Sequence, residues 1–171
     1  WNVSGMSTVP VPRVLAKPSE EQDIDVLFAG SVESPERLDA LKSRRSTIRV
    51  LDRGAILADL RRAGLRVEAV LPNAARFGSD LDSLVERSKV ILNLHYYEGA
   101  VFEIFRCSQM LANRKCVVTE DGGCDDELES FAKRATVYTE RKHIVKVCKE
   151  LVADVKQRRE WERVGYEEFM K

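Results

Sequence analysis

The chain has 171 residues, 44% hydrophobic and 33% charged, which is typical of one globular domain rather than a disordered segment. Lysine and arginine together number 28, as do aspartate and glutamate, so the net charge is zero and the basic excess of a nucleic-acid-binding module is absent. No apolar run approaches the ~20 residues of a membrane span, so we expect neither a nucleic-acid partner nor a spanning helix.

Residues 1–22 predict an extended linker, followed by one domain over 23–171. Pro10, Pro12 and Pro18 fix the backbone and remove hydrogen-bond donors, which disfavours a helix. Because the first residue is Trp rather than Met, we expect the chain to be a processed or excised piece.

The domain begins with a nearly continuous apolar run over 24–31 that ends in Gly30 and Ser31. Such a run is typical of a parallel strand buried on both faces. Ser34 and Pro35 then suit the N-cap and the first position of a helix.

Residues 46–53 are compatible with either a short strand or the lead into the next helix, which is predicted over 55–63. Gly64 is expected to end that helix in the left-handed conformation. A second strand is predicted over 65–71.

The same alternation continues to the C-terminus. Further strands are predicted over 89–95, 116–120 and 135–138, and further helices from 78–80, over 101–112, 144–155 and 156–171. The aromatic residues of the last helix are spaced to touch one surface. Strands alternating with helices predict an α/β fold, a doubly wound (Rossmann-like) parallel sheet with helices on both faces. Ligands of such sheets bind beyond the carboxyl ends of the strands.

Gly30 and Ser31 follow the first strand at that edge. A glycine lets a ligand approach the backbone, and the N-terminus of the following helix offers free N–H groups to a phosphate. An ordinary tight turn explains the same residues equally well, since neither a Rossmann fingerprint nor a P-loop pattern accompanies them.

Residues 93–106 combine a strand end, a polar and aromatic cluster, and a helix start. His95 can act as a base or a donor near neutral pH. Glu103 and Arg106 share a helix face, where a guanidinium can bind a diphosphate and a carboxylate can accept sugar hydroxyls. The alternative is a structural Glu103–Arg106 ion pair, with His95 bonded to the backbone.

Residues 120–123 (Glu-Asp-Gly-Gly) follow the fourth strand and suit either a loop that holds polar ligand atoms or a solvated turn. The acidic run 125–127 is expected to start a helix rather than to bind a cation. The arginine pairs 44–45, 61–62 and 158–159 are expected to lie on solvated helix faces.

The cysteines show no spacing typical of a metal site. Cys107, Cys116 and Cys148 lie in apolar segments, which predicts buried free thiols. With no signal peptide in the printed sequence, we expect a reducing, cytoplasmic location and no bound metal.

A family resemblance is carried by segments that occur in a fixed order, namely 25–31, 56–60, 64–67, 88–98, 102–113 and 117–120. Over about 23–155 the chain resembles the C-terminal half of GT-B glycosyltransferases, in particular the bacterial group related to the spore-maturation CgeB proteins. The resemblance implies metal-independent binding of a nucleoside-diphosphate sugar, which is a substrate and not a cofactor. It also implies a partner, an N-terminal acceptor-binding domain.

The resemblance assigns roles by position. Gly30 and Ser31 would approach the diphosphate, and Arg37 is a weak substitute for the lysine that usually accompanies the arginine there. Catalytic candidates are His95 and Glu98, and the further substrate-binding candidates are Tyr97, Glu103, Arg106 and Glu120.

Two other classes of function remain open. A non-catalytic binding or interaction module could keep the same fold without the chemistry. A flavodoxin-like or receiver domain is disfavoured, because His95 stands where the third strand of a receiver domain would carry a phosphate-accepting aspartate.

Overall fold

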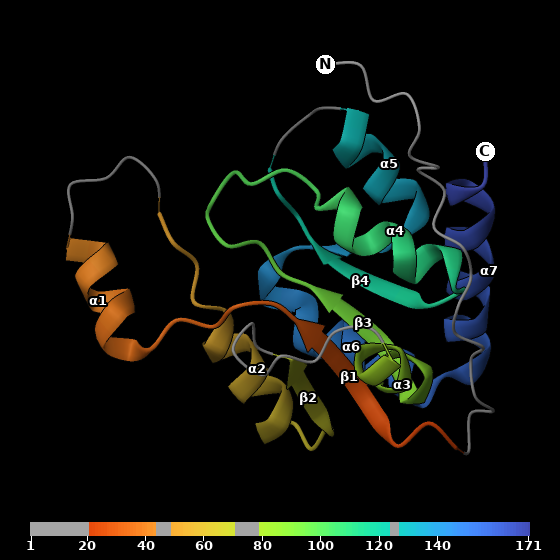
Figure 1. The fold of residues 1–171 in the computed structure, drawn as a ribbon, viewed down its shortest axis with the longest axis horizontal. Helices are drawn as coiled ribbons and strands as arrows, with labels where there is room; N and C mark the ends of the chain where they lie inside the picture. The colour runs from red at the N-terminus through yellow and green to blue at the C-terminus, as the bar shows by residue number, and fades with distance from the viewer. Residues whose placement is uncertain (1–20, 44–48, 71–78, 124–126) are drawn as a thin grey trace.

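The computed structural model describes residues 21–43, 49–70, 79–123 and 127–171 (Figure 1). Five strands form one parallel sheet in the order β2-β1-β3-β4-β5. The strands are β1 (Ile24–Ala29), β2 (Val67–Val70), β3 (Ser88–Asn93), β4 (Cys116–Glu120) and β5 (Val137–Thr139). The predicted parallel α/β sheet is therefore confirmed.

Helices connect the strands and cover the sheet. They are α1 (Pro35–Ser43), α2 (Arg53–Arg62), α3 (Ser79–Arg87), α4 (Ile104–Ala112), α5 (Glu127–Ala135), α6 (Ile144–Ala153) and α7 (Val155–Phe169), with a 3-10 turn at Arg141–His143. In Figure 1, α1 lies apart from the sheet, and α7 runs along the opposite side of the molecule.

Two apolar clusters, one on each face of the sheet, form the core. Neighbouring residues of β3 alternate between them, so that Ile91 joins the cluster with α3, α4 and α5, whereas Val90 and Leu92 join the cluster with α2 and α6. The sheet is thus buried on both faces, which explains why the sequences of its strands are nearly continuous apolar runs.

Local signals set the start of α1 and the end of α2 where the sequence predicts them, whereas α4 begins at Ile104 instead of near residue 101 and β5 begins at Val137 instead of residue 135. The Ser34 hydroxyl accepts a hydrogen bond from the Arg37 amide at 3.3 Å and begins α1. Gly64 has φ +86°, the left-handed conformation predicted after α2. In the ambiguous segment, the Asp52 carboxylate caps α2, and Val50 forms a single antiparallel bridge with Tyr97. Residues 46–48 lie outside the described part.

The two C-terminal helices differ from the prediction in their boundary. The apolar periodicity predicted one helix through residue 155, but α6 ends at Ala153 and α7 begins at Val155. The carboxylate of Asp154 accepts a hydrogen bond from the Gln157 amide at 2.9 Å, so this residue caps a new helix instead of continuing the old one.

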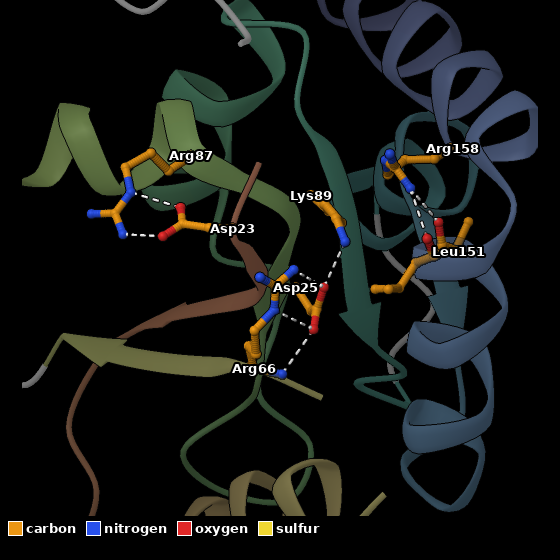
Figure 2. Close-up of polar contacts among 8 residues, drawn as sticks. Asp23, Asp25, Arg66, Arg87, Lys89, Leu151 and Arg158 are labelled. Carbon is orange, nitrogen blue, oxygen red and sulfur yellow. Dashed lines mark hydrogen bonds and ion pairs between the residues drawn. The ribbon is translucent and has the colours of Figure 1, made fainter. Parts of the chain in front are cut away.

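The arginine at position 158, predicted on a solvated face, is fully buried, so that prediction was wrong. Its guanidinium donates hydrogen bonds to the carbonyls of Leu151 (2.8 Å) and Val152 (3.2 Å), at the C-terminus of α6 (Figure 2). Helix ends leave carbonyls without intrahelical partners, and this side chain supplies the donors. The aromatic side chains of α7 do not share one surface, because Trp161 and Phe169 pack against different core clusters.

The buried carboxylate of Asp25 joins three strands near their amino ends (Figure 2). It accepts a hydrogen bond from the Lys89 ammonium at 2.7 Å and three from Arg66, two from the guanidinium and one from the amide. Burial alone would raise the pKa of this carboxyl, but the hydrogen bonds from Arg66 and Lys89 outweigh burial and lower the pKa to about 2.

Because the folded-state pKa of Asp25 lies below its unfolded value of 3.8, its stabilisation is present above that value and is lost as the pH falls toward 2. We expect Asp25→Asn to lower the free energy of unfolding by about 2 kcal/mol at neutral pH, and less at low pH. Urea denaturation between pH 2.5 and 7 would measure this, roughly across the titration range of carboxyls. The control is Asp59→Asn in an exposed ion pair, which should cost under about 0.5 kcal/mol. A pH-independent cost would contradict the assignment.

A second buried charge lies at position 115. The Lys115 side chain is fully buried and donates to the carbonyls of Glu86 (3.1 Å) and Ser88 (3.3 Å), where α3 passes into β3. Burial is the main cause that lowers the pKa of this ammonium to about 8.

The unfolded chain therefore binds more protons than the folded one between pH 8 and 10.5, and Lys115 makes stability rise with pH in that window. We expect the rise to be about 3 kcal/mol for the native chain relative to Lys115→Met, because the methionine has no proton to lose. Denaturation curves of both proteins at pH 7.5 and 10.5, about the span of this titration, would test it. An equal change in the free energy of unfolding of the two proteins between these pH values would contradict it.

Candidate functional site

The carboxyl ends of the parallel strands meet at one edge of the sheet, where the strand arrows end in Figure 1. Between β1 and β3 the chain changes direction across the sheet, since β2 flanks one side and β4 and β5 the other. Such a switch point is where doubly wound proteins bind their ligands. The predicted site residues that follow β1 and β3 lie at this position.

An arginine that sequence reasoning missed lies directly beside the end of β1. Arg53, the first residue of α2, donates from Nη2 to the Ser31 hydroxyl at 2.6 Å. Its guanidinium lies 5.7 Å from the ring centroid of Phe28 and 4.7 Å from that of Tyr96. The residue is 4% exposed, and within the described chain it makes no ion pair with a carboxylate.

A buried cation without a paired carboxylate is unusual, because leaving water costs free energy that a counter-ion ordinarily offsets. Burial lowers the pKa of the Arg53 guanidinium and repulsion from the nearby Arg106 lowers it further, and the opposing attraction of Glu103 and Glu33 does not restore its ordinary value. The surroundings of Arg53 therefore favour an added anion.

The predicted residue Arg106 reaches the same place from α4. Its guanidinium lies 2.5 Å from a carboxylate oxygen of Glu103 and 3.5 Å from the amide oxygen of Asn93, at the end of β3. A Cβ atom on Gly30 would lie 3.5 Å from Nη1 of Arg106 and 2.9 Å from the ring of Phe28. The missing side chain of Gly30 thus leaves room for the ring of Phe28, and the guanidinium of Arg106 lies at ordinary contact distance beside it.

The structure brings together at this point four residues predicted for the diphosphate and ribose. They are Gly30, Ser31, Glu103 and Arg106, and Arg53 adds a second cation. Arg37, the sequence candidate for that cation, is instead 70% exposed and pairs with Glu33 at 2.8 Å. The signal for Arg53 was its position one residue after the Asp52 cap, which places it at the N-terminus of a helix beside this edge.

His95 is buried and linked to the end of β4. Its backbone amide donates to Oε2 of Glu120 at 3.1 Å, and its Nε2 lies 2.9 Å from the carbonyl oxygen of Glu120. Because a carbonyl only accepts, Nε2 carries a proton, and when the ring is neutral Nδ1 is left as an acceptor. This Nδ1 is buried and has no hydrogen-bond partner in the described part of the chain.

Glu120 is also buried, and both carboxylate oxygens contact the protein. Oε1 lies 2.7 Å from the guanidinium of Arg141, which also donates to the backbone carbonyl of Asp52. Asp52 caps α2 immediately before Arg53. Glu120 and Arg141 therefore hold the start of α2 against the ends of β3 and β4.

The other two predicted residues are more accessible. Tyr97 is 43% exposed and packs edge-on against Tyr96, with 5.9 Å between ring centroids. A carboxylate oxygen of Glu98 lies 3.7 Å from a guanidinium nitrogen of Arg49. Both side chains can reach a ligand without unfolding any element.

Two cavities lie beside these residues. The larger, of about 540 Å³, is lined mostly by the loop 96–103 and the start of α4, and Glu103 and Arg106 belong to its wall. The smaller, of about 310 Å³, is lined by His95, Glu98 and Glu120, and Tyr97 borders both. The predicted sugar-side residues thus share one cavity, next to the one that Glu103 and Arg106 line, whereas Gly30, Ser31 and Arg53 are not part of either wall.

The described ranges contain neither a metal site nor a membrane-spanning helix. In the described ranges, no three His, Cys, Asp or Glu side chains are grouped so that they could hold a metal ion. No helix in the same ranges is long and apolar enough to cross a membrane.

Comparison with solved structures identifies the class of fold. The crystal structure of the C-terminal domain of a glycosyl transferase group 1 family protein (LpcC) from Francisella tularensis is similar to this chain with a TM-score of 0.54, at 12% identity and over 92% of this chain and 93% of that one. The structure of TarM is similar over 94% of this chain and 34% of its own length, with a TM-score of 0.46 and 14% identity. No family profile and no curated protein matches the sequence. The chain has the Rossmann-like fold of the C-terminal domain of a GT-B glycosyltransferase.

If Arg53 serves a ligand rather than the fold, Arg53→Met should leave the free energy of unfolding within about 1 kcal/mol of the native value, because methionine keeps the packing on both rings. Millimolar inorganic pyrophosphate should raise the melting temperature of the native chain and not that of Arg53→Met. Arg62→Met, which removes an exposed cation from the same helix, should respond like the native chain. A loss of about 3 kcal/mol or more in Arg53→Met would mean that the guanidinium is structural.

Proposed function

We propose that this chain is the donor-binding half of a glycosyltransferase related to the bacterial CgeB-like group, and that it binds a nucleoside-diphosphate sugar. The observation that supports this most strongly is the convergence of Arg53 and Arg106 at the end of β1, where Arg53 is buried without a paired carboxylate. A diphosphate supplies the negative charge that this position lacks. The fold, shared with a glycosyltransferase domain, places the position where such proteins bind ligands.

In this proposal the two guanidiniums neutralise the diphosphate, with the Ser31 hydroxyl as an additional donor. Glu103 accepts the ribose hydroxyls, and its ion pair with Arg106 fixes both side chains before the ligand arrives. Donors that are already in place when charge develops on the leaving diphosphate stabilise the transition state without reorganisation.

The sugar would extend toward the cavity of His95, Tyr97, Glu98 and Glu120. An acceptor hydroxyl forms the new bond to the anomeric carbon as the bond from that carbon to the diphosphate oxygen breaks, and a base takes the hydroxyl proton. We assign the acceptor and its base to an N-terminal acceptor-binding domain. The two guanidiniums would neutralise the leaving diphosphate, as a metal ion does in other transferases. We assign the enzyme to the cytoplasm.

A second candidate is a non-catalytic module that binds a nucleotide or another phosphorylated ligand at the same position. The observation that favours it is the burial of His95, because the backbone amide and Nε2 of this predicted catalytic residue bond to Glu120. Such a module would bind the ligand without transferring the sugar.

Calorimetric titration of the 171-residue chain with UDP, GDP and their sugar conjugates tests donor binding. We expect one base to be preferred and Arg106→Ala to weaken that binding by about 1–3 kcal/mol, as for the loss of a charged hydrogen bond. Arg163→Ala, an exposed arginine of α7, is the matched control and should bind normally. Absence of binding at millimolar nucleotide, with the chain folded, would contradict the proposal.

A further inference from the structure

The smaller cavity is lined by more hydrogen-bond acceptors than donors. Its volume of about 310 Å³ lies at the small end of the range of roughly 300–1,000 Å³ for small-molecule sites. Its charged and titratable wall consists of His95, Glu98, Glu120, Asp121, Glu140 and Arg141. It adjoins the diphosphate position, because Arg141 also donates to the carbonyl of Asp52, the residue before Arg53.

The one guanidinium in this wall is already engaged. Arg141 bonds to Glu120 and to the backbone of Asp52, so it is committed to protein oxygens.

Asp121 is held ionised, because a hydrogen bond from the Tyr138 hydroxyl (2.6 Å) and one from the Gly123 amide (2.8 Å) lower the pKa of this carboxyl.

The remaining two carboxylates are balanced only by exposed side chains. Glu140 lies 2.7 Å from Lys142, whose side chain is 67% exposed, and Glu98 lies 3.7 Å from Arg49, which is 76% exposed. Such pairs are weak, because water screens them and both side chains remain free to move. The cavity therefore keeps a negative character.

The buried ring of His95 adds an acceptor to the same wall. Its Nε2–H donates to the Glu120 carbonyl, so in the neutral ring Nδ1 is an acceptor, and this atom has no partner in the part of the chain that the structure describes. A buried acceptor without a donor costs free energy, which a ligand that brings a donor would recover.

We propose that this cavity is the sugar subsite and that it selects a sugar whose exposed groups are hydroxyl or ammonium donors, excluding a sugar that carries a carboxylate. The inference rests on the proposed donor binding and adds the class of sugar. Hydroxyl and ammonium groups donate to carboxylates and to Nδ1. A uronate would lose its water beside like charges, and the one guanidinium of the wall is already bonded to Glu120 and to the backbone of Asp52.

Matched donors test the selection directly. UDP-glucose and UDP-glucuronate, or GDP-mannose and GDP-mannuronate, differ only in a hydroxymethyl group and a carboxylate, so the nucleotide part of the affinity cancels. We expect the neutral sugar to bind about tenfold more tightly to the 171-residue chain, the size of a modest like-charge penalty.

Asp121→Asn should reduce this preference about threefold, because it removes one charge and keeps the oxygen that accepts from Tyr138. Glu140→Gln is the second variant, in case the first does not fold, and should act in the same direction. Glu150→Gln, an exposed carboxylate of α6, is the control and should leave the preference unchanged.

If the chain binds the nucleotide but binds the neutral sugar nucleotide and its uronate with equal affinity, or prefers the uronate, this inference is overturned and the proposed function is not. Failure of UDP and GDP themselves to bind would overturn the proposed function and this inference with it. A preference for the neutral sugar that Asp121→Asn and Glu140→Gln leave unchanged would overturn the role assigned to the cavity charges.

Discussion

The site depends on one buried carboxylate, that of Glu120. Its two oxygens accept from the His95 amide at the end of β3 and from Arg141 after β5, and Arg141 in turn bonds to the backbone at the start of α2. Four elements that are distant in sequence are thereby held at one edge of the sheet. The position of Arg53 beside Ser31 follows from this connection, because Arg53 is the next residue after the bonded carbonyl of Asp52.

The buried charged side chains at the two edges of the sheet, Asp25 and Arg53, differ in the partners that they have. Near the amino ends of the strands, Asp25 is buried together with its cations Arg66 and Lys89, so that ion pairs and hydrogen bonds offset the loss of water. At the carboxyl edge, Arg53 is equally buried but has no carboxylate paired with it in the described chain. Lys115, buried at the amino end of β4, also lacks a paired carboxylate in the described ranges, but its ammonium donates to two backbone carbonyls. In the described part of the chain, the acceptor of the Arg53 guanidinium is the Ser31 hydroxyl, which carries no charge.

Periodicity and turn chemistry were sufficient to predict the parallel sheet, the strand β4 and the left-handed Gly64, because local sequence determines these features. Arg106 and Gly30 could be proposed for the same reason, since each directly follows or faces a strand end. The place of Arg53 at a helix start could be inferred from the sequence, but its pairing with Ser31 could not, because that pairing depends on how Arg141 holds α2 through Asp52, a contact across 89 positions of sequence. The burial of Arg158 could not be predicted either. A charged side chain near a helix end is expected to be solvated unless the position of the neighbouring helix is known.

The same arginine determines where this domain can be cut. The sequence resemblance to glycosyltransferases covers about residues 23–155, which would suggest residue 155 as the end point of a shortened expression clone. Yet removal of α7 would take away the donors on the last carbonyls of α6 and uncover the place where Gly165 approaches Leu111 so closely that a Cβ there would lie 2.9 Å from a methyl carbon. The last helix is thus an integral layer of the domain, and a fragment without it would present an open apolar surface to other molecules.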